Sequence, residues 1–251
     1  MGRLLHFEFH KLLRQKSFYI CLAVSVAMLL ATTYTSVLIS RGVAEPADIG
    51  VDGMDVMIGA VSGGMLSMVI GVFVPLFVCE DYAAGTIRNI ITRGYTRLGV
   101  FAAKLTAVLL AAAVMTAVCM AAGYIAGTVL GGRGAQAFDA GVVKILLCQL
   151  AVILAQAALF YAISSVLQKT GGAIAICLVL PMVMTVLLTL ADTALAEKEI
   201  ELSGYWIDRV SSSLGSFDVS SDELKKALLT ALAYFIAAGA GSFLAIAKRE
   251  Y

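Results

Sequence analysis

The sequence has little charge and few groups that carry out chemistry. Asp, Glu, Lys and Arg make up 14% of its 251 residues, with two histidines, three prolines and one tryptophan. It has no G-x-x-x-x-G-K-[ST] loop, which excludes nucleotide binding by that route. No paired carboxylates lie within an apolar run, and no G-x-S-x-G elbow accompanies a histidine and an acid, which argues against a membrane hydrolase. His6 and His10 lack the glutamate spacing and third ligand of a zinc site, so we expect no metal.

What the sequence has in abundance is apolar side chains. Hydrophobic residues make up 61% of the chain and the mean hydropathy is +0.94, which indicates a membrane protein. The net charge of +1 is divided between membrane sides, so we expect no nucleic-acid partner. The five cysteines form no CxxC and lie in or beside apolar runs, where we interpret them as packing residues: Cys21, Cys79, Cys119, Cys148 and Cys177.

The apolar runs predict an all-α membrane protein, because each reaches the ~20 residues that cross a bilayer as a helix, and the third is longer than a crossing needs. The six expected spans are about 18–39, 56–79, 98–129, 142–167, 172–191 and 223–247. Before them, residues 3–16 predict an interfacial helix with Leu5, Phe9, Leu12 and Leu13 on one face. A signal peptide is the alternative there, but the following apolar run is too long for one.

The charges predict that both termini are cytoplasmic. With six spans, 11 of the 18 Lys and Arg but only 4 of the 17 Asp and Glu fall on the inner side, as the positive-inside rule requires. The acidic outer segment before the last span holds the only tryptophan, so we expect an interfacial or re-entrant piece at about 200–215, with Tyr205, Trp206, Val210 and Leu214 near one face. Ser220 to Glu223 is typical of a capping box that opens the last span.

Two patterns within the spans concern helix contacts. Small residues at i+4 intervals predict close helix packing in the second span, at Gly59, Gly63, Ser67 and Gly71, and a second stripe at Gly123, Gly127 and Gly131. Pro181 predicts a kink in the fifth span. Gln149 and Gln156 lie i, i+7 on one face, where they line a polar pathway or form interhelical hydrogen bonds.

The stretch from Asp81 to Lys104 is a basic island between two apolar runs. Its four cations, Arg88, Arg93, Arg97 and Lys104, follow Glu80 and Asp81, which marks the cytoplasmic side. Helical spacing puts Ile87, Ile90, Ile91 and Tyr95 on one side, and Arg88, Asn89, Thr92 and Arg93 on the other. The island is therefore either an amphipathic helix that presents a face to a partner or a solvated loop that only sets topology.

This stretch resembles the first cytoplasmic loop of ABC transporter permeases of the type-2 exporter family. The matching positions are Asp81, Tyr82, Gly85 and Thr86, then a helix from Ile87 to Thr92, then Thr96 and Arg97. The amphipathic start, the six spans and the short segment before the last span are also similar to the family. The small first outer loop resembles the compact bacterial members.

The resemblance implies a permease that has no ATPase of its own and binds a separate ATPase subunit through a coupling helix at about 84–94. The implied contact residues are Gly85, Thr86, Ile87, Arg88, Asn89, Ile90, Ile91, Arg93 and Tyr95. Glu80, Asp81, Arg97 and Lys104 are expected to support that helix structurally.

The resemblance also implies the setting in which the chain works. We expect no cofactor on this chain, ATP and Mg on the partner subunit, a second permease copy or paralogue, and a multi-pass location in a bacterial plasma membrane. Walls of Ala, Gly, Val, Leu and Met suit export of an amphipathic peptide or a lipophilic antibiotic. The alternatives are a non-transporting membrane sensor or anchor that uses the same ATPase, and an ion-coupled carrier, which the lack of charge at mid-span disfavours.

Overall fold

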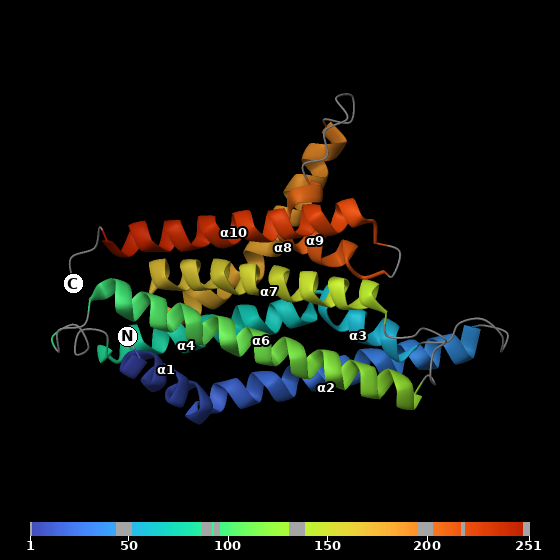
Figure 1. Cartoon of the computed structure of the whole chain (residues 1–251), viewed down its shortest axis with the longest axis horizontal. Helices are drawn as coiled ribbons and strands as arrows, with labels where there is room; N and C mark the ends of the chain where they lie inside the picture. Colours follow the sequence, from blue (N-terminus) through green and yellow to red (C-terminus); the bar gives the residue numbers. More distant parts are fainter. Residues whose placement is uncertain are drawn as a thin grey trace.

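The chain folds into a bundle of α-helices, with no β-strand among the residues that can be described (Figure 1). The computed structural model describes residues 2–43, 52–86, 92, 96–130, 139–194, 203–216 and 219–247. The helices are α1 (Gly2–Arg14), α2 (Lys16–Val43), α3 (Gly53–Ser62), α4 (Met65–Ala83), α6 (Arg97–Leu130), α7 (Ala140–Leu167), α8 (Thr170–Ala194), α9 (Ile207–Ser213) and α10 (Ser221–Ala247), with a 3-10 turn, η2 (Ser203–Tyr205). The expected all-α class is confirmed.

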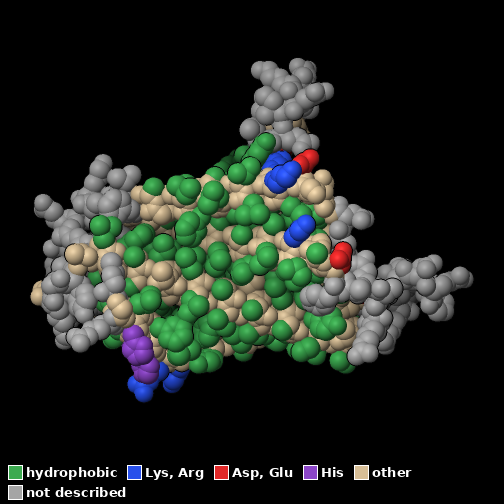
Figure 2. Space-filling model, viewed as in Figure 1, with side chains coloured by type: hydrophobic (Ala, Val, Ile, Leu, Met, Phe, Trp, Pro, Cys, Tyr) green, Lys and Arg blue, Asp and Glu red, His purple; other side chains and the backbone are tan. Residues whose placement is uncertain are grey.

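Six of these helices are long and apolar enough to cross a membrane. The candidate spans are Lys16–Ile39, Met65–Ala83, Leu98–Leu130, Ala140–Leu167, Thr170–Ala194 and Ser221–Ser242. On the face drawn in Figure 2, hydrophobic side chains cover the middle of the molecule, while the coloured charged side chains gather toward the two ends of the long axis. This distribution is compatible with a bilayer, because the apolar belt would face the lipid tails and the charged side chains would reach water on either side.

The core lies where α4, α6 and α7 meet. Val74, Val108 and Ile153, one from each helix, have no exposed surface. Phe73 and Phe77 stack along α4 with ring centroids 5.8 Å apart, and Phe18 of α2 meets Phe73 edge-on at 5.7 Å. Because lipid tails are as apolar as these side chains, close packing rather than the hydrophobic effect holds such helices together.

The second expected span, 56–79, is not one helix. It is divided into α3 and α4 at Gly63 and Gly64, and the spanning helix is Met65–Ala83. Gly64 adopts φ = +75°, in the left-handed region that glycine enters without steric cost. Two successive glycines therefore allow the chain to change direction where the hydropathy pattern predicts continuity.

Helix α8 departs from the common direction of the other helices. Pro181 lies inside it, as the sequence predicts, and Ala173 and Cys177, which are buried, both precede that proline. The later part of α8 projects beyond α10 in Figure 1. Pro181 cannot donate a hydrogen bond to the carbonyl of Cys177, which loosens the helix at the position where it leaves the bundle.

The segment before the last span packs into the bundle as the short helix α9. Trp206, Val210 and Leu214 are buried, whereas Tyr205, expected on the same face, is 58% exposed because it belongs to η2 and not to α9. The ring of Trp206 meets Tyr234 of α10 edge-on with centroids 6.0 Å apart. Helix α10 then opens with the expected capping box, in which the Glu223 carboxylate accepts a hydrogen bond from the Ser220 backbone N–H at 3.0 Å.

The ends of several helices gather at one end of the molecule. Helix α1, the end of α4, the start of α6 and the end of α10 all lie at the same end of the long axis in Figure 1. This is the arrangement that an even number of crossings produces.

Candidate functional site

The expected coupling segment lies between the end of α4 and the start of α6. Gly85 and Thr86 are described, and Gly85 has φ = +65°, which ends α4 in a left-handed turn. Ile87, Arg88, Asn89, Ile90 and Ile91, and then Arg93 and Tyr95, lie outside the described residues, as does most of the coupling helix expected at 84–94.

Beside this segment, Asp81 of α4 joins three helices. Its two carboxylate oxygens accept hydrogen bonds from Lys11 of α1 and from Lys104 of α6. Asp81 is 5% exposed and Lys104 is 2% exposed, so this is a buried ion pair and not a surface one. A buried pair of this kind costs desolvation energy and keeps its charges only while both partners remain. The expected support residues Asp81 and Lys104 thus contact each other, whereas the side chain of Arg97 is not described.

Glu8 of α1 extends this network. It is 1% exposed, and within the described part of the chain its Oε2 atom has no hydrogen-bond partner. Burial raises the pKa of the Glu8 carboxyl above its ordinary value, and the charge of Lys104 opposes that rise. The inward face of α1 is therefore Leu4, Glu8 and Leu12. Of the expected apolar face, Leu5, Phe9 and Leu13 are exposed, whereas Leu12 is buried and so does not share that face.

Two further contacts join α1, and the residue that links it to α2, to the end of α4. The Gln15 side chain donates a hydrogen bond to Glu80 at 2.7 Å. The Lys11 ammonium lies 5.3 Å from the centroid of the Phe77 ring, within the range of a cation–π contact. The N-terminal helix is thus attached to the residues that lead directly into the coupling segment.

The glycine ladder of the expected second span does not act as one packing stripe. A Cβ atom at Gly59 would meet nothing within 4 Å, Gly63 stands at the break, and Ser67 is buried. Gly71 does pack closely, since a Cβ there would lie 3.4 Å from the Phe160 ring.

Two glycines of the second predicted stripe lie at a close helix contact. A Cβ at Gly127 of α6 would fall 2.6 Å from the Cα of Gly53 in α3, and one at Gly123 would fall 3.1 Å from the Val56 carbonyl oxygen. Gly131 lies outside the described residues. Small residues on α6 therefore allow α3 to lie against it at close range.

The two glutamines of α7 both form interhelical hydrogen bonds. The Gln149 amide nitrogen donates to the carbonyls of Ile58 and Leu214, both at 3.0 Å, and its side chain has no exposed surface. The Gln156 amide donates to Asp208 of α9 at 2.6 Å. Both glutamines therefore form interhelical hydrogen bonds, which is one of the two sequence-based alternatives. The polar pathway stays a prediction.

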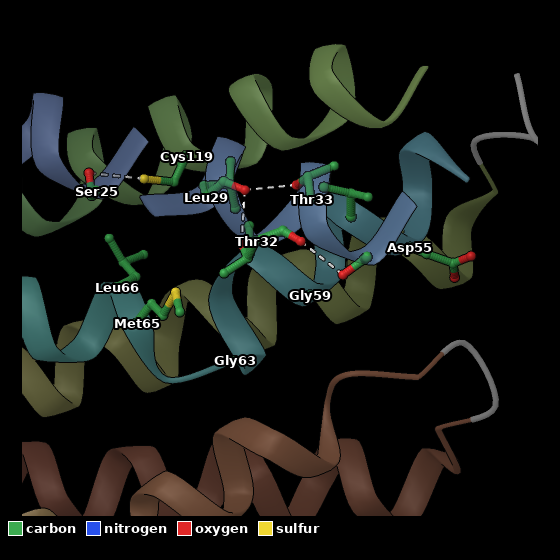
Figure 3. Close-up of a pocket in the computed structure, with 13 residues that line it drawn as sticks. Ser25, Leu29, Thr32, Thr33, Asp55, Gly59, Gly63, Met65, Leu66 and Cys119 are labelled. Atoms are coloured by element: carbon green, nitrogen blue, oxygen red, sulfur yellow. Dashed lines mark hydrogen bonds between the residues drawn. The ribbon is translucent and has the colours of Figure 1, made fainter. Parts of the chain in front are cut away.

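A cavity of about 420 Å³ opens between α2, α3 and α6 (Figure 3). Its walls combine apolar side chains such as Leu29 and Leu66 with the hydroxyls of Ser25 and Thr33. The hydroxyls are already used, because Thr33 donates to the Leu29 carbonyl at 2.8 Å and Ser25 accepts from the Cys119 thiol at 3.3 Å. The walls therefore present mostly apolar surface, which suits a lipid chain or another apolar group.

Comparison with known proteins decides the family. A family model described as "ABC-2 family transporter protein" matches residues 4–192, which is most of the chain. The chain belongs to the ABC-2 transporter family. A search among curated proteins found no match.

Proteins of the ABC-2 family are membrane components of ABC transporters. The matched range includes α1, α4 and α6, so the helices joined at Asp81 all belong to the ABC-2 region. Sequence reasoning assigned Asp81 and Lys104 to this region but missed Lys11 and Glu8. The one signal for them was that α1 carries a lysine and a glutamate three residues apart beside apolar positions.

Proposed function

We propose that this chain is the transmembrane subunit of an ATP-driven exporter. A separate ATPase subunit binds the segment from Gly85 to Tyr95, carries the ATP and Mg, and transmits its movement to α4 and α6. The single observation that carries the proposal is the ABC-2 family match over residues 4–192. The attachment of that segment to two long helices that share the buried Asp81–Lys104 pair supports it, because a rigid junction passes on a rigid-body movement.

The proposed cargo is an amphipathic peptide or a lipophilic antibiotic, carried by two permease subunits in a bacterial plasma membrane. Apolar cavities support this choice, since their walls offer apolar surface and few free polar groups. The alternatives are a non-transporting sensor or anchor that uses the same ATPase and an ion-coupled carrier.

The decisive experiment changes the apolar side of the coupling segment. We expect Ile90→Asp to reduce co-purification with the neighbouring ATPase subunit, and cargo-stimulated ATP hydrolysis, at least tenfold, because a carboxylate would be desolvated in the ATPase cleft. Ser216→Asp, which adds the same charge at an exposed position after α9, is the control and should retain both.

Three outcomes would contradict the proposal in different ways. Normal ATPase binding and export by Ile90→Asp would show that the contact face is wrong. Stimulated hydrolysis without cargo movement in sealed vesicles would favour the sensor. Transport that continues after ATP depletion and stops when the ion gradients collapse would favour the ion-coupled carrier.

A further inference from the structure

A second cavity, of about 390 Å³, lies among α4, α7, α8 and α9. Its walls are apolar, with Phe160 from α7 and Leu178, Met182 and Val186 from α8. Two lining methionines, Met68 and Met182, have unbranched, flexible side chains that adapt to ligands of different shapes. One lining residue has a different character: Asp208, from the short helix α9.

Asp208 is held at this wall from two sides. Trp206, Ile207 and Val210 of the same segment are buried against the bundle, so the backbone of α9 is fixed. One carboxylate oxygen, Oδ1, accepts the hydrogen bond of 2.6 Å from the Gln156 amide. The other oxygen, Oδ2, is buried near the Trp206 indole, and neither Oδ2 nor the indole nitrogen has a hydrogen-bond partner of good geometry among the residues that the structure describes.

An unpartnered carboxylate oxygen in an apolar wall is costly. A buried acceptor without a partner costs about 1–3 kcal/mol, and more when it is charged. Burial raises the pKa of the Asp208 carboxyl above its ordinary value, and the neighbouring Gln156 amide and Trp206 indole oppose that rise. No Lys or Arg among the described residues forms an ion pair with it. A cation brought to this carboxylate would therefore be attracted strongly, because no charged partner of Asp208 neutralises it among the described residues.

We propose that this cavity binds an organic cation with an apolar body, whose positive charge pairs with the Asp208 carboxylate while its hydrophobic part fills the space between α4 and α8. Phe160 lines the same cavity, and aromatic rings attract cations through their quadrupole. That this ligand is the exported cargo rests on the proposed function. That it binds in this cavity does not depend on the proposed function. The inference narrows the cargo from amphipathic molecules in general to cationic ones.

The chain carries its own reporter for this site. Trp206, the only tryptophan, stands two residues from Asp208, so its fluorescence reports ligand at this cavity. The probes are tetraphenylphosphonium and tetraphenylborate, ions of the same shape and opposite charge. The full chain, purified in a nonionic detergent without ATPase or nucleotide, is titrated with each ion, and protein-free detergent corrects for partitioning.

We expect saturable binding of the phosphonium to the wild-type chain, with the borate at least tenfold weaker. Asp208→Asn should raise the Kd for the phosphonium at least tenfold, while its amide oxygen still accepts the Gln156 bond. Asp222→Asn is the matched control, because the Asp222 side chain is 87% exposed on α10, and its Kd should stay within twofold of wild type.

Two results would overturn the inference: equal binding of the two ions by the wild-type chain, or an unchanged phosphonium Kd in a folded Asp208→Asn variant. The comparison of ions needs no variant, so it decides the matter even where the substitution impairs folding. If the chain binds the phosphonium but exports no cargo, the proposed function is wrong and this site stands. If the chain exports a cargo but binds both ions equally, this site is wrong and the proposed function stands.

Discussion

Asp81 is the residue at which α1, α4 and α6 meet, and its energetics follow from burial. The sequence predicted that Asp81 and Lys104 belong to the same structural support, because both lie beside the basic island. It did not predict Lys11 as the second partner, since 70 residues separate Lys11 from Asp81 and helical periodicity carries no information about contacts between distant segments.

Removing one partner of this network should be costly. We expect Asp81→Asn to lower the free energy of unfolding by about 3–5 kcal/mol, because it removes the counter-charge that contacts the buried Lys104 ammonium and leaves only the Glu8 carboxyl nearby. Unfolding by SDS in mixed micelles, followed by circular dichroism, measures this change.

A double-mutant cycle measures the interaction energy between Asp81 and Lys104 apart from their other contacts. Combining Asp81→Asn with Lys104→Met should recover a large part of the loss, because no isolated charge then remains between α4 and α6. Lys225→Met removes an exposed ion pair with Asp222 on α10 and should change the unfolding free energy by less than about 1 kcal/mol. Additive effects of the two inner substitutions would show that Asp81 and Lys104 do not interact.

At the scale of helices, small residues set how closely α3 and α6 approach. We expect Gly127→Ala to lower the free energy of unfolding by about 1–3 kcal/mol, because its Cβ would lie 2.6 Å from the Gly53 Cα and the two backbones must separate. Gly239→Ala in α10 is the control, since a Cβ there meets nothing within 4 Å and alanine favours a helix by roughly 0.5–1 kcal/mol. Equal effects of the two substitutions would contradict the close approach of α3 to α6.

The same helices show where prediction from sequence succeeds and fails. Helix existence is a local property, so apolar length predicted the six spans. The break between α3 and α4 depends on a backbone torsion at Gly64, which hydropathy does not register. That break also invalidates the i+4 ladder from Gly59 to Gly71, because positions on either side of it no longer share a helix face.

For the candidate site residues, too, prediction from sequence succeeded where the signal is local and failed where it depends on contacts between distant segments. The basic island could be located from charge alone, because the cytoplasmic side of a membrane protein collects Lys and Arg. Asp208 could not be recognised, because in the sequence it is one of several acidic residues in an outer segment. Only the docking of α9 against α7 and α8 turns it toward an apolar cavity.

At the scale of the whole molecule, α4 links the two regions that carry the proposals. Its first turns contribute Ser67 and Met68 to the Asp208 cavity, and its last turns hold Asp81 beside the coupling segment. A helix of 19 residues, at ~1.5 Å per residue, spans most of the hydrocarbon layer between them. A ligand that displaces the start of α4 therefore acts on the same helix that the ATPase would move, with Pro75 between the two regions.

All of this requires that the coupling end of the bundle face the cytoplasm. We expect Lys169→Cys, in the exposed turn between α7 and α8, to react with a membrane-impermeant maleimide only after cells are permeabilised, and Ser216→Cys, after α9, to react in intact cells. The excess of Lys and Arg at the end that holds Lys169 is the physical reason, because positive loops remain on the cytoplasmic side. The five native cysteines are buried, so the unsubstituted chain is the blank. Labelling of Lys169→Cys in intact cells would place Asp81 and the coupling segment outside, where no ATPase subunit could bind them.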